Sequence, residues 1–325
     1  MDRELPRLLV ATRPDPATDA AVERRLPGVP WAYLVSSRPD RWGSVEAVLL
    51  GPQRPASGRF DPYELPRLSF VQSLYAGLDG TRLDELPRSA EVAGNVGAYA
   101  PFVAEHALAL ALAASRSLIA AHAQVIAGRL RPAPEHRLLF DRTAVILGYG
   151  AIGRAISERL AGFHAQVLGL NRSGRAGPGA ERMFASSELR TAVAAGDVVF
   201  DARPLTRSTR GSIGTAELEA MKPDAIYVNV GRAAVVQEEA LYRHLVAHPD
   251  FRAALDVWWN EDFTDGTLRS RFPFASLPNV VATPHSAGYG PGVLPYVLDV
   301  ALENLARFFR GERPLHIADR SEYGP

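Results

Sequence analysis

A cation, a carboxylate and an imidazole each follow one of three apolar segments late in the chain. They are Arg232, Glu261 and His285. Because the carboxyl ends of parallel strands meet at one edge of a sheet, we expect these side chains to converge if the segments are neighbouring strands. An arginine binds a carboxylate, an imidazole transfers a proton, and a nearby carboxylate favours the protonated imidazole. The set predicts proton transfer on an anionic substrate, whereas any one member alone would indicate only a solvated or structural residue.

A glycine-rich turn stands between an apolar run over 144–147 and a helical stretch that is expected to end near 162. A second apolar strand is expected over 166–170. The turn has the pattern G-x-G-x-x-G, formed by Gly148, Tyr149, Gly150, Ala151, Ile152 and Gly153. In this setting the glycines permit a tight turn, a close approach of a pyrophosphate, and close packing of helix on strand. The helix N-terminus then faces the phosphates, so the segment predicts a dinucleotide site rather than an incidental turn.

The end of the second strand indicates which dinucleotide is bound. An NAD site usually carries an acidic residue there for the ribose diol. Here the residues are Asn171, Arg172 and Ser173, so no carboxylate would repel a 2′-phosphate, and the arginine and serine could bind one. The composition favours NADP, with NAD as the alternative. With such a cofactor, the charged set suits hydride transfer to a 2-keto acid, which needs a cation for the carboxylate and a proton donor for the ketone oxygen.

The elements that must position these residues alternate between strands and helices. This pattern predicts an α/β fold of two doubly wound, parallel-sheet (Rossmann-like) domains. The remaining expected strands are 8–11, 32–35, 45–50, 68–72, 91–93, 197–201, 225–230, 251–257 and 280–283. The expected helices include a single buried connector over 102–126 and a closing helix over 292–310.

The composition excludes several classes of protein. The chain has 325 residues, 47% of them hydrophobic and 22% charged, with a formal net charge of zero, which predicts a globular protein without a nucleic-acid or membrane partner. It has no cysteine, which excludes disulfides and thiolate chemistry, and no compact His/Asp/Glu spacing predicts a metal site. The N-terminus lacks the apolar run of a secretory signal, and the apolar stretch 107–114 is too short to span a bilayer. We therefore expect a soluble, cytoplasmic protein.

Several motifs together resemble the D-isomer-specific 2-hydroxyacid dehydrogenases. Besides GYGAIG, they are VAEH at 103–106, PLT at 204–206, NVGRAAVVQEEAL at 229–241, Asp256-Val257 with Glu261, and TPHSAG at 283–288. The resemblance covers most of residues 70–310 and is weakest over 1–65. It implies an NAD(P)-dependent enzyme that transfers a hydride between the cofactor and a small 2-keto or 2-hydroxy acid, with D specificity, similar to glyoxylate and hydroxypyruvate reductases.

The resemblance also implies a role for individual residues. Arg232 would bind the carboxylate and carbonyl of the substrate, His285 would transfer the proton, and Glu261 would hydrogen-bond His285 and stabilise its charged form. Asp256 would hold the nicotinamide carboxamide. The remaining implied residues are Ala76 and Gly77, whose backbone N–H groups would bind the substrate carboxylate, and the cofactor contacts Pro204, Thr209, Val230 and Gly288.

The implied domain organisation is discontinuous. The substrate domain would consist of residues 1–95 and 289–325, with a dinucleotide-binding domain of residues 96–288 between these two segments in the sequence. Two copies of the chain would form a homodimer largely through their dinucleotide-binding domains. A further candidate comes from position alone. Arg54 follows the strand expected at 45–50 and could contact a polar or anionic substrate tail, although a solvated surface arginine is the more ordinary interpretation.

The chain departs from the family pattern beside the expected site. Ala233 replaces a usual glycine, Asp262 replaces a usual proline, and Trp258-Trp259 is bulkier than is typical, so the loop around Glu261 is expected to differ. Formate dehydrogenases of the superfamily carry glutamine at the position of Glu261. Two alternatives remain at this point: an NAD-linked enzyme acting on phosphoglycerate or another acid, and a nucleotide-sensing corepressor of the same fold.

Overall fold

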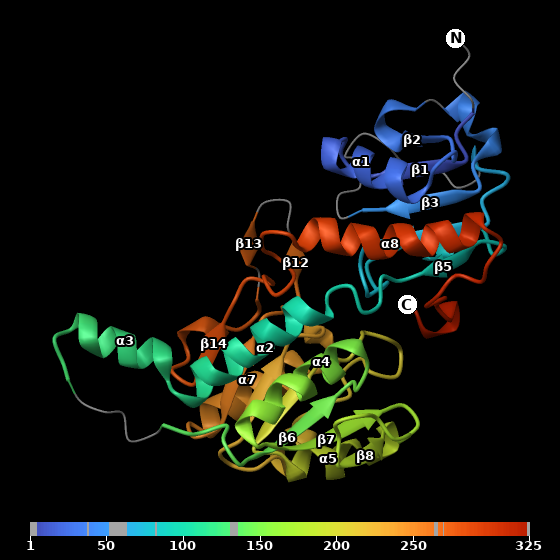
Figure 1. Ribbon diagram of the computed structural model, residues 1–325. Coiled ribbons are helices and arrows are strands. Elements are labelled where there is room, and N and C mark those ends of the chain that lie inside the picture. Colours follow the sequence, from blue (N-terminus) through green and yellow to red (C-terminus); the bar gives the residue numbers. More distant parts are fainter. Residues whose placement is uncertain are drawn as a thin grey trace. The chain divides into compact units, whose positions relative to one another are not determined.

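The chain divides into two compact units (Figure 1). The computed structural model describes residues 5–37, 39–51, 64–81, 83–130, 136–262, 266–268 and 270–323. Unit 1 comprises Met1–Tyr99 and Gly290–Pro325, and unit 2 comprises Ala100–Tyr289. The sequence placed the two changes of domain at 95/96 and 288/289.

Unit 1 is built on a five-stranded parallel sheet. Its order is β2-β1-β3-β4-β5. The strands are β1 (Leu8–Ala11), β2 (Trp31–Tyr33), β3 (Ala47–Leu50), β4 (Phe70–Ser73) and β5 (Glu91–Ala93). The chain starts inside the sheet, moves to one edge and then returns to build the other side, which is a doubly wound order.

Both faces of this sheet are covered. Successive strand residues point to opposite faces, so Leu8 and Val10 pack on one side while Leu9 packs on the other. The first side lies under helices α1 (Pro16–Arg25) and α8 (Val293–Phe309). The second side is covered by short 3₁₀ turns and loops, in which Trp42 is buried. Because α8 comes from the end of the chain, the core of unit 1 needs both segments of sequence.

Unit 2 contains a seven-stranded parallel sheet with the order β14-β11-β10-β9-β6-β7-β8. The strands are β6 (Thr143–Leu147), β7 (Gln166–Asn171), β8 (Arg182–Ala185), β9 (Val198–Asp201), β10 (Ile226–Asn229), β11 (Arg252–Leu255) and β14 (Val280–Ala282). Winding reverses between β6 and β9, and ligands of doubly wound sheets bind at the carboxyl ends of the strands beside such a reversal. The fold class predicted from the sequence is thereby confirmed.

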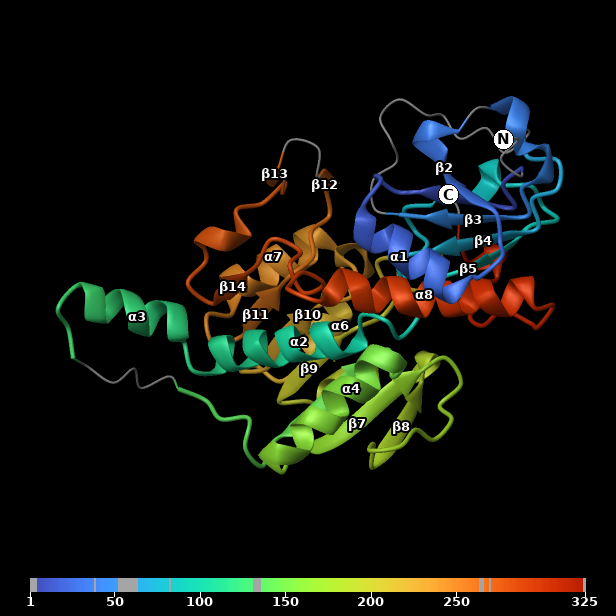
Figure 2. The same ribbon diagram turned by 45° about the horizontal axis from the view of Figure 1, so that its top comes forward.

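Helices cover both faces of the unit 2 sheet (Figure 2). α2 (Ala100–Ser115) and α4 (Ala151–Leu160) pack together on one face. α5 (Leu189–Ala195), α6 (Thr215–Ala220) and α7 (Glu238–Ala247) pack on the other, over a core that contains Tyr227 and Phe251. The strands between them are buried on both sides, which explains their nearly continuous apolar sequence.

The prediction of one buried connector helix over 102–126 is wrong. The chain forms α2 and then α3 (Leu118–Ile126), separated at Ser117, which has left-handed backbone (φ 49°). The guanidinium of Arg252, on β11, donates to the carbonyls of Ala114 and Ser115 and so satisfies the end of α2. α3 has no buried residue and extends away from the rest of unit 2 in both views (Figures 1 and 2).

Within the described ranges, no single helix is long and apolar enough to cross a membrane; α2 and α3 together reach that length and composition but are bent by 58°.

Two features of unit 2 were not predicted from the sequence. β8 adds an edge strand beside β7, and β12 (Glu261–Asp262) pairs with β13 (Thr267–Leu268) as a short antiparallel ribbon. The ribbon places Glu261 at the start of a strand, opposite Leu268.

Candidate active site

Two members of the predicted charged set are in direct contact. Nδ1 of His285 lies 2.8 Å from Oε1 of Glu261, and their side chains are 28% and 21% exposed. The same carboxylate oxygen accepts the backbone N–H of Trp258 at 2.8 Å. With Nδ1 donating to a carboxylate, Nε2 is the ring nitrogen that can exchange a proton with a ligand.

The loop that carries His285 is held by a buried carboxylate. Oδ1 of Asp256 accepts the hydroxyl of Thr283 at 2.6 Å and the N–H of Ser286 at 2.8 Å, and Oδ2 accepts the N–H of Ala287 at 3.1 Å. Nε2 of His106 is 3.1 Å from the Thr283 hydroxyl. This loop needs such support, because His285 itself has left-handed backbone (φ 53°), which costs free energy for a non-glycine residue.

These contacts also set the charge of Asp256. Its side chain is only 1% exposed. Burial alone raises the pKa of the carboxyl, but hydrogen bonds from His106, Thr283 and the two backbone N–H groups outweigh burial and lower the pKa to about 2. Asp256 is therefore an anion that anchors the histidine loop, a contact that its predicted carboxamide role did not include.

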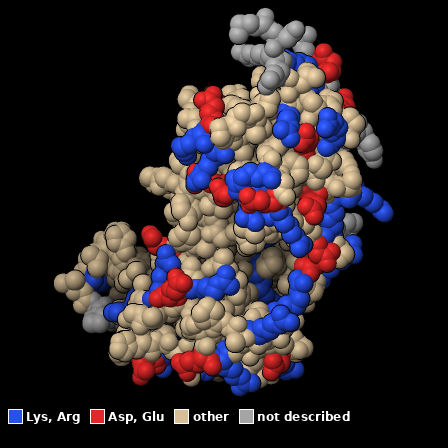
Figure 3. All heavy atoms as spheres, turned by 45° about the vertical axis from the view of Figure 1, so that its right-hand side comes forward, with Lys and Arg blue, Asp and Glu red and all other residues tan. Residues whose placement is uncertain are grey.

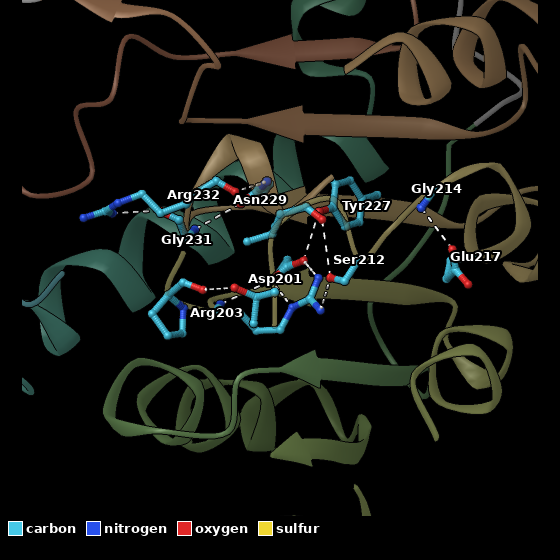
Figure 4. A network of polar contacts seen from close by, with 12 residues as sticks. Asp201, Arg203, Ser212, Gly214, Glu217, Tyr227, Asn229, Gly231 and Arg232 are labelled. Atoms are coloured by element: carbon cyan, nitrogen blue, oxygen red, sulfur yellow. Dashed lines mark hydrogen bonds and ion pairs between the residues drawn. The ribbon is translucent and has the colours of Figure 1, made fainter. Parts of the chain in front are cut away.

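Arg232 lies on the turn that follows β10. Oδ1 of Asn229 accepts the N–H of Gly231 at 3.1 Å, and its Nδ2 donates to the Arg232 carbonyl at 3.2 Å (Figure 4). The side-chain amide of Asn229 thus closes the turn from inside. The Arg232 guanidinium donates to the Gly231 carbonyl at 2.9 Å.

A buried ion pair lies beneath this turn (Figure 4). The guanidinium of Arg203 donates to both oxygens of Asp201, at 2.9 and 2.6 Å, and to the hydroxyl of Ser212 at 2.9 Å. The Tyr227 hydroxyl donates to Asp201 at 3.1 Å. Burial, and next the charge of Asp201, raise the pKa of Tyr227 well above its ordinary value, so this hydroxyl stays protonated.

Two glycines touch the backbone of the same segment. A Cβ on Gly148, the first glycine of the glycine-rich turn, would lie 2.9 Å from the Arg203 nitrogen. A Cβ on Gly231 would lie 2.6 Å from the Arg203 carbonyl oxygen. Gly148 also has positive φ (85°), so glycine is needed there for conformation as well as for space. The glycine-rich turn and the Arg232 turn therefore pack against one stretch of main chain.

The glycine-rich turn lies between β6 and α4, beside the reversal of the sheet. A Cβ on Gly153 would meet the Gly148 carbonyl oxygen at 2.6 Å, whereas a Cβ on Gly150 would meet nothing within 4 Å. The second glycine thus leaves open space where a pyrophosphate would approach the N-terminus of α4. The Tyr149 ring is buried and its hydroxyl donates to the Pro178 carbonyl, so only the backbone of this predicted residue could face a cofactor.

The predicted cofactor-specifying residues follow β7. Asn171 orders this loop: its Oδ1 accepts the N–H of Ser173 at 3.1 Å and its Nδ2 donates to the Arg175 carbonyl at 2.9 Å. Arg172 and Ser173 are exposed. The loop therefore presents two donors suited to an anion, while the Asn171 amide has a structural role.

The remaining predicted residues are spread over the two units. The Thr209 hydroxyl donates to the Pro204 carbonyl at 2.6 Å and so closes the loop after β9. Val230 is buried and Gly288 half-buried, both in unit 2. Ala76 and Gly77 follow β4 in unit 1. Arg54 lies outside the described residues, and no group of His, Asp and Glu suited to a metal ion occurs among those described.

Charges of both signs are interspersed over the face shown in Figure 3, in keeping with the zero net charge.

Several residues that hold the site were not predicted from the sequence. They are His106, Asn229, the Asp201–Arg203 pair and the indole N–H groups of Trp258 and Trp259. Only the ion pair could have been predicted from the local sequence, because two opposite charges at the end of a buried apolar strand are expected to pair with each other.

Comparisons with known sequences found a family match and relatives with assigned names. Residues 108–287 match the NAD-binding domain of the D-isomer specific 2-hydroxyacid dehydrogenases. A glyoxylate reductase from Thermococcus gammatolerans is 31% identical over 258 residues, which are 77% of this chain and 75% of the relative.

Two solved structures are similar over nearly their whole length. One, from Pyrobaculum aerophilum, is described as a candidate formate dehydrogenase; it is 33% identical with a TM-score of 0.83, covering 98% of this chain and 100% of that one. The other is a D-isomer specific 2-hydroxyacid dehydrogenase from Xanthobacter autotrophicus in complex with NADPH and MES, 25% identical with a TM-score of 0.80, covering 97% and 98%. The chain therefore belongs to the D-isomer specific 2-hydroxyacid dehydrogenases, enzymes that transfer a hydride between a nicotinamide cofactor and a 2-keto or 2-hydroxy acid.

Proposed function

We propose that this enzyme reduces a small 2-keto acid to the D-2-hydroxy acid with NADPH, using His285, Glu261 and Arg232. The observation that carries the proposal is the 2.8 Å contact between His285 and Glu261 in the unit that also holds the glycine-rich turn. It pairs an acid–base group with a charge that favours its protonated form. Arg232 follows β10, which neighbours β11 in the same sheet.

A nicotinamide cofactor held at the glycine-rich turn would supply a hydride to the carbonyl carbon of the substrate. As the carbonyl oxygen becomes an alkoxide, it takes the proton from Nε2 of His285, leaving a neutral imidazole whose Nδ1–H still donates to Glu261. Arg232 binds the carboxylate and polarises the carbonyl, so it both orients the substrate and stabilises the growing charge. In the reverse direction, His285 accepts the proton from the hydroxy acid.

The exposed donors after β7 support NADP as the cofactor. Arg172 and Ser173 could bind a 2′-phosphate, and Asn171 holds the loop in place. The Xanthobacter relative was solved with NADPH. NAD is the alternative, in which Arg172 would have no phosphate to bind.

Relatives named glyoxylate reductase support a small substrate such as glyoxylate or hydroxypyruvate. Glu261 argues against formate as the substrate of this chain. Its proposed role is to stabilise a proton donor, and formate, which has no ketone oxygen, needs none. A polar or anionic tail on the substrate would be a ligand for Arg54.

We also propose that the enzyme is a homodimer in which α3 lies against the second copy. Leu118, Ile119, Val125 and Ile126 are 51%, 67%, 60% and 74% exposed. One short helix with this many exposed apolar side chains is typical of a protein interface.

The test is a screen of 2-keto acids with NADPH and NADH, run on the unmodified enzyme and on His285→Ala. We expect a small 2-keto acid with NADPH to give the highest kcat/KM, and His285→Ala to lose about 10²- to 10⁴-fold in kcat. Near-normal turnover without His285 would refute the mechanism and favour a nucleotide-sensing role instead.

A further inference from the structure

Two adjacent tryptophans hold the segment that carries Glu261. Trp258 is buried, with 6% of its surface exposed, and its indole N–H donates to the Thr283 carbonyl at 2.9 Å. Its backbone N–H donates to Glu261 at 2.8 Å. Since Thr283 is two residues before His285, this one residue contacts both the carboxylate and the chain that presents the imidazole.

Trp259 connects the same segment to the Arg232 turn. Its indole N–H donates to the Val236 carbonyl at 2.8 Å. Val236 directly follows the 3₁₀ turn Ala233–Val235, which begins after Arg232. The Trp259 ring stacks on Phe274, with centroids 5.2 Å apart and planes 15° apart, and Phe274 is fully buried.

The Trp258 ring also packs edge-on against the Phe274 ring, with the two ring centroids 6.4 Å apart. The two rings therefore share one fixed aromatic support, while their two N–H groups point to different carbonyls. A buried indole N–H needs an acceptor, so each ring is fixed in direction as well as in place. An aliphatic residue could fill the same volume but could not make either bond.

We propose that Trp258 and Trp259 are positioning residues that fix Glu261 between the histidine loop and the Arg232 turn. This inference rests on the proposed function, because it assigns the tryptophans an effect on catalysis through Glu261. The segment needs such anchors, since residues 257–260 form a bend without regular structure between β11 and β12. A shift of about 1 Å in a catalytic group can cost 10²-fold in rate, so anchoring by two hydrogen bonds has a measurable consequence.

The test replaces each tryptophan by phenylalanine, which keeps a ring and removes the donor. We expect kcat for keto-acid reduction to fall roughly fivefold in Trp258→Phe and in Trp259→Phe, the effect of one neutral hydrogen bond, while the dissociation constant of NADPH stays within twofold. Trp42→Phe is the matched control. Trp42 is equally buried and donates to the Ser37 hydroxyl at 3.0 Å in unit 1, so its loss should lower the thermal midpoint and leave kcat unchanged.

A second measurement separates positioning from a merely structural role. In an enzyme that already carries Glu261→Ala, Trp259→Phe should cause no further fall in kcat, because the group that it positions is absent. An equal fall in both backgrounds would overturn the inference, as would unchanged kcat in both phenylalanine variants. If a phenylalanine variant failed to fold, 3-benzothienylalanine at the same position keeps the two-ring shape, lacks the N–H and gives the same comparison.

The inference and the proposed function fail in different ways. Near-normal turnover in His285→Ala would remove the proposed function. An inactive His285→Ala together with fully active Trp258→Phe and Trp259→Phe would remove only the role of the tryptophans.

Discussion

Replacing Glu261 by glutamine tests the central charge of the site without moving it. The glutamine carbonyl oxygen can still accept the N–H of Trp258 and Nδ1–H of His285, at the positions where the carboxylate accepts both at 2.8 Å. Only the negative charge is lost. Because a carboxylate stabilises the imidazolium that donates the proton better than a neutral amide does, the variant should reduce the keto acid more slowly.

The size of the effect follows from the exposure of the pair. A hydrogen bond between charged groups contributes about 1.5–3 kcal/mol, and the lower end applies here because both side chains keep 28% and 21% of their surface in water. About 1.5 kcal/mol corresponds to about a tenfold change in rate. The kcat of keto-acid reduction should therefore fall about tenfold in Glu261→Gln.

The assay is kcat for NADPH-dependent keto-acid reduction, with NADPH binding measured alongside. Glu239→Gln is a suitable control, since Glu239 is an exposed residue of α7 whose partner is Arg243 and its loss should leave kcat unchanged. Glu261→Ala removes both the charge and the acceptor and should lower kcat further than Glu261→Gln does. If the glutamine variant turned over as fast as the unmodified enzyme, Glu261 would have no electrostatic role and the assignment would be wrong.

Three further outcomes are expected. Arg172→Ala should lower kcat/KM for NADPH about 10- to 100-fold and change that for NADH little, and equal losses would contradict the 2′-phosphate contact. In Asp256, a folded pKa of about 2 against about 3.9 in the unfolded chain contributes about 2–3 kcal/mol of stability above pH 4, which is lost as the pH falls toward 2. Urea unfolding should accordingly show that the unmodified enzyme loses this stability on acidification and Asp256→Asn does not. Ile119→Glu with Ile126→Glu should shift sedimentation from dimer to monomer, and an unchanged dimer would place the interface elsewhere.

The sheets of this fold could be predicted because their strands are short apolar runs bounded by polar or glycine residues. The edge strand Arg182–Ala185 was missed since it begins with a polar residue and alternates, with Arg182 over the Phe184 ring. The break between α2 and α3 has no glycine or proline at its centre. It depends on the Arg252 guanidinium, which reaches the end of α2 from β11, and no local pattern carries that information.

The candidate site, too, could be predicted only in part. That Glu261 and His285 would meet follows from a rule about strand ends, which needs only the order of the strands. The contacts that fix their geometry do not follow from it. An indole N–H can reach any of several carbonyls, and the pairing of Trp259 with Val236 or of His106 with Thr283 depends on packing of elements distant in sequence.

The reversal of winding between β6 and β9 divides the seven-stranded sheet into two halves, and each half carries a different set of the predicted site residues. The β6–β7–β8 half carries the glycine-rich turn and the loop at 171–173, whereas the β9–β10–β11–β14 half carries Arg232, Asp256 and His285. The residues proposed to select the coenzyme and those proposed to transfer the proton thus lie on opposite halves of one sheet. On this assignment, mutations that exchange one coenzyme for the other can accumulate on the first half, in evolution or in the laboratory, without disturbing the groups proposed to perform the reaction.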